Sequence, residues 1–206
     1  MEFYQWCFFN LFKTMLQEKL SKYNIILASG SPRRQEFLKG LDIPFSIQLK
    51  EVEEKYPKYL KGAEITNFLA NLKASVFTNL SEKDILITSD TIVWLDNKAI
   101  GKPKNFNDAV NILQQLSGKK HQVITSISIK NKYFQKIVHN STDVYFKELS
   151  DEEIIYYINN YKPFDKAGAY GIQEWMGFIA INKIEGSYFN VAGFPTHLLY
   201  KELMNL

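Results

Sequence analysis

The sequence predicts an α/β fold built on a mixed central sheet. Short apolar runs typical of buried strands alternate with segments of helical spacing. Hairpin connections outnumber long crossovers, which favours a mixed sheet over a purely parallel one. A length of 206 residues suits one compact domain, in which folding removes roughly 70% of the extended-chain surface from solvent.

The overall composition excludes several classes of protein. Hydrophobic residues make up 46% and charged residues 23% of the chain, which excludes a disordered chain and a coiled coil. The net charge of +3 gives no reason to expect a nucleic-acid partner, and no RNP1-type string occurs. The single cysteine, Cys7, excludes an intrachain disulfide framework and a cysteine zinc cluster, and the histidines lack HxxxH or HExxH spacing.

Residues 1–14 differ from the rest of the chain because six aromatic side chains crowd into them. Asn10 and Lys13 interrupt the apolar run, no signal cleavage site follows, and the run is too short to cross a bilayer. Three interpretations stay open: upstream translated sequence with Met15 as the natural start, a helix packed on the body or on a second subunit, and an interfacial membrane anchor. The lack of a Lys/Arg cluster weakens the anchor. We expect residues 15–206 to form a single domain, and a chain beginning at Met15 to stay folded and active.

The first half of the chain predicts repeated strand–helix units. The apolar run Tyr23–Ser29 predicts a buried strand that leads directly into a helix over Ser31–Lys39. Ser31 suits the N-cap, Pro32 the first helical position and Gly40 the C-terminal stop. The further elements expected here are the strand Phe45–Leu49, the helix Ala63–Leu80 and the buried strand Asp84–Thr88.

The second half predicts a hairpin and then paired strands between helices. Ile92–Leu95 and Lys98–Ile100 flank Asp96-Asn97, a dipeptide typical of a tight turn. The further elements expected here are the helix Asn107–Leu116 ending near Gly118, the paired strands Val123–Ile129 and Lys136–Phe146, the helix Asp151–Asn159, the strand Phe178–Ile184 and the closing helix Thr196–Met204.

The strand-to-helix junction Ser29–Arg34 is the first candidate binding site. A helix start presents free N–H groups and a partial positive charge, which attract anions. Arg33 and Arg34 add forked donors that suit phosphate. Taken alone, the string SPRR also fits an ordinary helix start with solvated arginines.

The segment Ser89–Thr91 is the second candidate, because it follows an apolar strand at its predicted carboxyl end. Ligands of open α/β sheets bind outside the carboxyl ends of the strands. A carboxylate placed there, such as Asp90, can hold Mg²⁺ or activate water. The alternative is a turn aspartate that bonds its own backbone.

Four further segments carry candidate groups, although each alone also fits an ordinary loop. In the loop Asp165–Gln173 the small residues permit a close backbone approach to a ligand, and Gln173 offers a donor and an acceptor that suit a base edge. The other three segments are the acidic stretch with Glu51, Glu53 and Glu54, the turn Gly101-Lys102-Pro103, and the loop Gly186–Pro195 that precedes a helix start.

The order of these segments closely resembles the Maf family of nucleotide pyrophosphatases. The segments are LASGSPRR (27–34), EE (53–54), SDT (89–91), GKP (101–103), GKKHQVITS (118–126), DKAGAYGIQ (165–173) and GSYFNVAGFP (186–195). The resemblance covers nearly the whole chain from Tyr23. It implies a twisted sheet with two lobes around a nucleotide cleft, as in inosine triphosphatase-like proteins, and hydrolysis of a nucleoside triphosphate to the monophosphate and pyrophosphate with a divalent cation, Mg²⁺ or Mn²⁺.

The DKAGAYGIQ segment resembles the family branch that hydrolyses dTTP and UTP, including modified uridine nucleotides. In that branch the residues matching Arg33, Thr91 and Gln173 are linked to substrate choice. The resemblance implies catalytic roles for Asp90, as the proton acceptor, Glu54 and Lys102, with Glu54 and Asp90 also holding the metal. The substrate-binding residues it implies are Ser29, Ser31, Arg33, Arg34, Lys73, Thr91 and Gln173.

Two residues depart from the family pattern: Glu174 stands where a small residue is frequent, and Phe194 replaces a leucine. The resemblance also implies a cytoplasmic homodimer that acts without nucleic acid or membrane. A second hypothesis is a nucleotide-binding regulator of cell division with weak or incidental hydrolysis. The carboxylates Glu54 and Asp90 argue against it, because a pure binder does not need to activate water.

Overall fold

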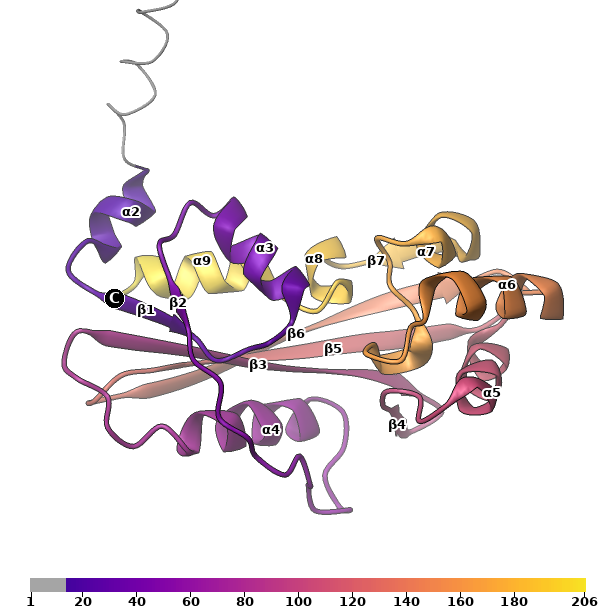
Figure 1. The fold of residues 1–206 in the computed structure, drawn as a ribbon, viewed down its shortest axis with the longest axis horizontal. Helices are drawn as coiled ribbons and strands as arrows, with labels where there is room; N and C mark the ends of the chain where they lie inside the picture. The colour runs from indigo at the N-terminus through magenta and orange to yellow at the C-terminus, as the bar shows by residue number, and fades with distance from the viewer. Residues whose placement is uncertain (1–13) are drawn as a thin grey trace, which may run out of the picture.

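The computed structural model describes residues 14–206, which surround one seven-stranded mixed sheet (Figure 1). Its order is β2-β1-β3-β5-β6-β7, with β4 also paired to β3. β1 pairs in parallel with β2 and β3, and the other pairs are antiparallel. The strands are β1 (Asn24–Leu27), β2 (Ser46–Ile47), β3 (Asp84–Leu95), β4 (Lys98–Ile100), β5 (Lys120–Lys130), β6 (Gln135–Phe146) and β7 (Ile181–Glu185). The predicted mixed α/β sheet is confirmed.

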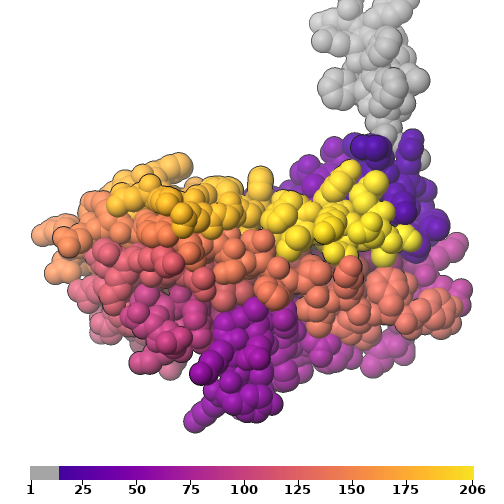
Figure 2. Space-filling model, turned by 180° about the vertical axis from the view of Figure 1, so that it is seen from behind, coloured from indigo at the N-terminus to yellow at the C-terminus, as the bar shows by residue number. Residues whose placement is uncertain are grey.

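Helices cover both faces of this sheet and one of its ends (Figure 1). On one face lie α2 (Met15–Leu20), α3 (Pro32–Gly40), α8 (Tyr188–Val191) and α9 (Thr196–Met204). The opposite face carries α4 (Ala63–Ser75). The far end carries α5 (Phe106–Leu116), α6 (Asp151–Tyr161), the short 3-10 helix η1 (Ala167–Ala169) and α7 (Trp175–Ala180). Figure 2 shows the C-terminal helix against the start of the described chain. Within residues 14–206 no helix is long and apolar enough to cross a membrane.

Two main hydrophobic cores occupy opposite ends of the long strands, which gives the two expected lobes. β3 contributes Ile85 and Ile87 to one core and Val93 and Leu95 to the other. The first core is completed by α2, α3 and α9, and the second by α5, α6 and α7. The middle of β3 therefore lies at the junction of the lobes.

The prediction that the second buried strand ends at Thr88 was wrong, because β3 continues through the polar segment to Leu95. Ser89 and Thr91 stay in register with Ile127 and Thr125 of β5. The hairpin that follows is confirmed. The two turn residues have left-handed backbones, with φ of 49° and 61°, as a type I′ turn requires.

Two other predicted boundaries were wrong. The helix α4 ends at Ser75 rather than Leu80, and Lys130 Nζ donates to the carbonyls of Ala74 (3.1 Å) and Phe77 (3.2 Å) at this C-terminus. The predicted strand 178–184 begins only at Ile181. Its first residues belong to α7, where a Cβ at Gly177 would lie 1.8 Å from the Ile172 carbonyl oxygen.

The start of the described chain bears on the expectation for a protein beginning at Met15. The segment of unusual composition lies outside the described residues, except for Thr14. Thr14 forms a capping box with Gln17 at the start of α2, and Leu16 and Leu20 of this helix are buried. A chain beginning at Met15 keeps both leucines and loses the cap, at a cost of about 1 kcal/mol.

A buried histidine gives the first testable prediction. His121 is 2% exposed, its Nε2 lies 2.8 Å from the Tyr170 hydroxyl, and its Nδ1 has no partner among the described residues. Burial lowers the pKa of His121 to about 4. In the unfolded chain His121 therefore binds a proton near pH 6.5, whereas in the folded chain it binds one only near pH 4. We expect the free energy of unfolding to fall by about 2 kcal/mol between pH 7.5 and 5.

Urea unfolding at a series of pH values measures this effect. His121→Gln should flatten the dependence between pH 6.5 and 5. An equally steep dependence in that variant would show that another group takes up the proton.

Candidate active site

A cleft of about 1080 Å³ opens at the middle of β3. β1 covers one edge of β3 along residues 84–87, and β4 covers the same edge along residues 93–95. Residues 88–92 of this edge have no neighbouring strand in the described part of the chain, and four of them, Ser89, Asp90, Thr91 and Ile92, line the cleft. All the residues expected in the site line it: Ser29, Ser31, Arg33, Arg34, Glu54, Lys73, Asp90, Thr91, Lys102 and Gln173.

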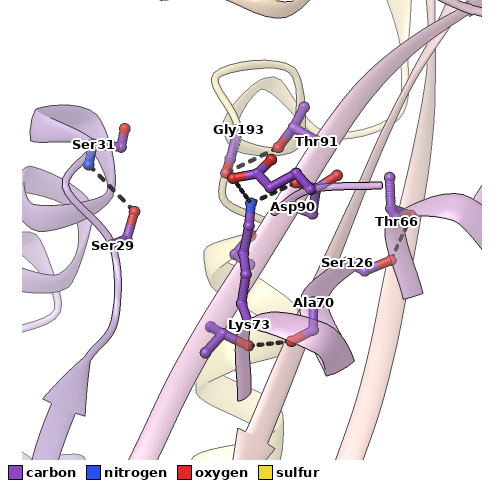
Figure 3. Close-up of polar contacts among 12 residues, drawn as sticks. Ser29, Ser31, Thr66, Ala70, Lys73, Asp90, Thr91, Ser126 and Gly193 are labelled. Carbon is purple, nitrogen blue, oxygen red and sulfur yellow. Dashed lines mark hydrogen bonds and ion pairs between the residues drawn. The ribbon is translucent and has the colours of Figure 1, made fainter. Parts of the chain in front are cut away.

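Two carboxylates and one ammonium form the centre of the cleft. Lys73 Nζ of α4 lies 2.7 Å from Asp90 Oδ1 and 3.1 Å from Glu54 Oε1. Figure 3 shows Lys73 reaching from its helix toward Asp90 on the neighbouring strand. Thr88, on the same face of β3 as Asp90, donates to the Ala70 carbonyl at 2.6 Å and so holds α4 against β3 beside Asp90. Three segments distant in the sequence therefore meet at one ammonium.

The environment of Asp90 disfavours its charged form. The residue is 5% exposed, and burial raises its pKa above the ordinary value, although Lys73 and Arg34 act in the opposite direction. A buried carboxylate of this kind holds a proton more tightly than a solvated one. Such a group is suited to accept a proton during a reaction.

Arg34 connects α3 to β3 and to the loop before α9 by hydrogen bonds. Its Nε donates to the Gly193 carbonyl at 3.0 Å, its Nη1 to the Ser89 carbonyl at 2.9 Å, and its Nη2 to Thr91 Oγ1 at 3.1 Å. Burial lowers the pKa of Arg34 to about 10, so it stays charged at neutral pH. Because each guanidinium nitrogen has a protein acceptor, the structure gives Arg34 a scaffold role. Its expected contact with substrate stays a prediction.

Arg33 is the more available of the two arginines. Its Nη1 lies 3.5 Å from Asp165 Oδ2 in a long, partly exposed ion pair. Lys102 lies exposed on the rim of the same cleft. Ser31 occupies the N-cap position of α3 without the predicted side-chain cap, and its own N–H donates to Ser29 Oγ at 3.3 Å. The positive groups of the cleft thus gather at the start of α3 and along the rim.

The loop 165–173 closes one end of the cleft. Gly168, with φ of +71°, donates its N–H to the Gly101 carbonyl at 3.0 Å and so fastens the loop to the turn that carries Lys102. Gln173 lines the cleft, and its Oε1 is buried without a hydrogen-bond partner among the described residues. A buried acceptor without a partner costs free energy unless a ligand supplies the donor.

Sequence reasoning left several lining residues out of the expected site. Asp165 and Lys166 line the cleft at the start of the loop of small residues. Two charged residues directly before such a loop are the sequence feature that could have identified them. The Gly193 carbonyl, which accepts from Arg34, could not be found this way because every residue carries a carbonyl. Thr125 does not line the cleft, but its Oγ1 lies 3.0 Å from Thr91 Oγ1, and this support from β5 depends on strand register.

The family described as Maf-like protein matches residues 24–206. The chain belongs to the Maf family. A relative from Flavobacterium johnsoniae named dTTP/UTP pyrophosphatase is 60% identical over 93% of this chain and 100% of the relative. A relative of the same name from Christiangramia forsetii is 56% identical over 93% of this chain and 98% of its own length. The predicted family is therefore confirmed.

Solved structures support the fold of this Maf chain. A HAM1 protein from Coxiella burnetii has a TM-score of 0.51 at 14% identity, covering 89% of this chain and 100% of the other. The Staphylococcus aureus Ham1 protein has a TM-score of 0.50 at 16% identity, covering 88% and 98%. At such low identity the likeness concerns the fold, and it agrees with the expected two-lobed architecture.

Proposed function

We propose that this Maf-family chain is a nucleoside triphosphate pyrophosphatase that hydrolyses dTTP and UTP to the monophosphate and pyrophosphate. The observation that carries the proposal is the meeting of Asp90, Glu54 and Lys73 in a cleft that also holds Gln173. The names of relatives that match at 60% and 56% identity support the same substrates. We further propose that residues 15–206 act as one unit.

The cationic side of the cleft suits the triphosphate. Arg33 and Lys102 lie where phosphate oxygens would enter, and the first turn of α3 adds backbone N–H donors. Phosphoryl transfer needs little covalent chemistry from the protein, so positioning and charge neutralisation dominate the rate. Arg33 would exchange its 3.5 Å contact with Asp165 for a bidentate contact with phosphate.

The part of the cleft lined by Gln173 suits a uracil or thymine base. Gln173 Oε1 needs a donor, and the N3–H of these bases is a donor where cytosine has an acceptor. The Gln173 amide N–H₂ can then donate to O4 of the same base. A base without this pattern leaves buried groups unpaired, which is an effective means of discrimination.

The carboxylates fit a divalent cation that the substrate helps to hold. Mg²⁺ takes one or two protein carboxylates together with phosphate oxygens and waters. Glu54 and Asp90 both contact Lys73 Nζ, so the two carboxylates lie close together. Residues 14–206 contain no group of three or more His, Cys, Asp or Glu that could hold a metal alone. Mg²⁺ or Mn²⁺ bound between them would supply charge neutralisation at the phosphates.

Proton transfer is assigned to Asp90. Its Oδ1 accepts from Lys73, so we assign Oδ2 to accept the proton of the water that attacks the α-phosphorus. The water oxygen bonds to phosphorus, the bond to the bridging oxygen breaks, and pyrophosphate leaves. Lys73 stabilises Asp90 in its charged form before the step and neutralises charge around the phosphates during it.

Replacing Gln173 with alanine tests the choice of base. We expect kcat/KM for UTP to fall by about 10- to 100-fold, because a buried hydrogen-bonding group is lost. We expect kcat/KM for CTP to change little, so the ratio of the two constants falls. Pyrophosphate release with each triphosphate measures this. Gln114→Ala, an exposed glutamine on α5, is the control, and an unchanged ratio in Gln173→Ala would move base selection to other residues.

The regulatory hypothesis is separated from hydrolysis by the wild-type protein itself. Magnesium-dependent release of pyrophosphate at enzymatic rates supports the hydrolase, whereas binding without turnover supports the regulator. The homodimer and the cytoplasmic location stay predictions.

A further inference from the structure

A series of polar contacts runs through the loop that carries Gln173. It begins at Tyr157 on α6, passes through Glu174 and Lys166, and reaches Asp165, which contacts Arg33. The three inner members, Glu174, Lys166 and Asp165, were not among the expected site residues.

Tyr157 holds the loop on both sides of Gln173. Its hydroxyl accepts from the Gly171 N–H at 3.0 Å and donates to the Glu174 carboxylate. The side chain is fully buried, and burial raises the pKa of this phenol, which keeps it a donor. Because Gly171 precedes Gln173 by two residues and Glu174 follows it directly, one hydroxyl fixes both flanks of the residue.

The side chains of Glu174 and Gln173 both lie against Gly171. A Cβ at Gly171 would lie 2.9 Å from Glu174 Cδ and 3.1 Å from Gln173 Nε2. Because the two side chains occupy the same small space beside Gly171, we expect a shift of the Glu174 carboxylate to displace the Gln173 amide.

Lys166 links this arrangement to the phosphate side. Its Nζ lies 3.0 Å from Glu174 Oε1 and 2.7 Å from Asp165 Oδ1, and the residue is 7% exposed. A buried ammonium needs its counter-charges, because loss of one partner leaves the charge without compensation. Asp165 in turn meets Arg33 at 3.5 Å. Glu174 and Asp165 are thus the two counter-charges of Lys166.

We propose that Glu174, with Tyr157 and Lys166, is a positioning residue that sets the Gln173 amide for base recognition. The proposal rests on the proposed function, since it assigns a role within the same site. The Glu174 carboxylate is paired with the Tyr157 hydroxyl and the Lys166 ammonium. Its position explains how the chain uses a glutamate where the resembled pattern has a small residue.

The test compares Glu174→Gln and Tyr157→Phe with a matched control. Glu202→Gln serves as the control because Glu202, like Glu174, is a glutamate paired with a lysine, here Lys136, and it lies buried in the other lobe. For each protein, kcat and KM are measured with UTP and with CTP, the inhibition constant is measured with inorganic pyrophosphate, and Tm is recorded.

We expect Glu174→Gln and Tyr157→Phe, called the loop variants, to raise KM for UTP by about 10-fold with a smaller change in kcat. The reason is that Gln173 loses the groups that hold it in position. The UTP/CTP ratio of kcat/KM should fall, and pyrophosphate inhibition should stay within about twofold of wild type. The control should keep the ratio even where its Tm falls. A ratio that stays at the wild-type value in both loop variants would overturn the proposal, whatever happens to Tm.

Calorimetric binding of UMP and CMP separates this proposal from the proposed function. If the wild type releases no pyrophosphate from UTP, the proposed function fails. The positioning role is then judged on the UMP/CMP affinity ratio alone, where a fall in Glu174→Gln supports it and an unchanged ratio overturns it.

Discussion

Replacing Asp90 with asparagine is expected to lower kcat by about 10²- to 10⁴-fold, the usual contribution of a positioned general base. Asparagine keeps the shape and can still contact Lys73, but it cannot accept a proton. Asparagine is a weaker metal ligand than aspartate, so kcat and binding are compared at saturating Mg²⁺, and Lys73 retains Glu54 as a counter-charge at 3.1 Å. Calorimetry should therefore still detect UTP binding in the variant.

Asp96→Asn is the matched control for this change, because the same substitution is made at an exposed turn on the same hairpin. Burial of the Asp90 charge is unfavourable to the fold, so we expect Tm of Asp90→Asn to be at or above that of wild type. A turnover close to wild type would remove Asp90 from the role of base. A lost turnover with lost UTP binding would point to damage of the whole cleft instead.

The elements that carry strong local signals could be predicted from the sequence. The strand before Ser29, the helix after it and the tight turn at Asp96-Asn97 follow from apolar runs, Pro32 and turn residues. The order of short motifs also predicted which residues come together, since the residues expected in the site line one cleft. Local signals succeed here because each motif lies at the end of an element whose direction the pattern already fixes.

Features that depend on partners far along the chain could not be predicted. The segment Ser89–Thr91 looks like a strand end because it is polar, yet β3 continues through it. Lys73 compensates Asp90, and Arg34 takes the Ser89 carbonyl that faces the gap between β1 and β4. Nor does a sequence distinguish the engaged Arg34 from the more available Arg33. The continuation of β3 and the difference between the two arginines both depend on which residue is the hydrogen-bond or ion-pair partner of a buried polar group. Those partners are set by the fold.

Replacing Glu54 with glutamine is expected to raise the Mg²⁺ concentration that half-saturates the reaction by about 10- to 100-fold. Glu54 lies in the segment between β2 and α4, its side chain is half-exposed, and its Oε1 meets the Lys73 ammonium beside Asp90. A neutral amide is a weaker ligand for a hard cation than a carboxylate. At saturating Mg²⁺ we expect kcat to return to within a few-fold of wild type, because Asp90 is still present.

Glu53→Gln is the control for this substitution, since Glu53 is the neighbouring carboxylate, is mostly exposed and pairs with Lys55. Titration of pyrophosphate release with Mg²⁺ and with Mn²⁺ measures the two variants against wild type. If Glu54 acts only as a counter-charge for Lys73, its loss lowers kcat at every metal concentration and leaves the half-saturating value unchanged. The shape of the titration therefore distinguishes a metal ligand from an electrostatic partner at the same carboxylate.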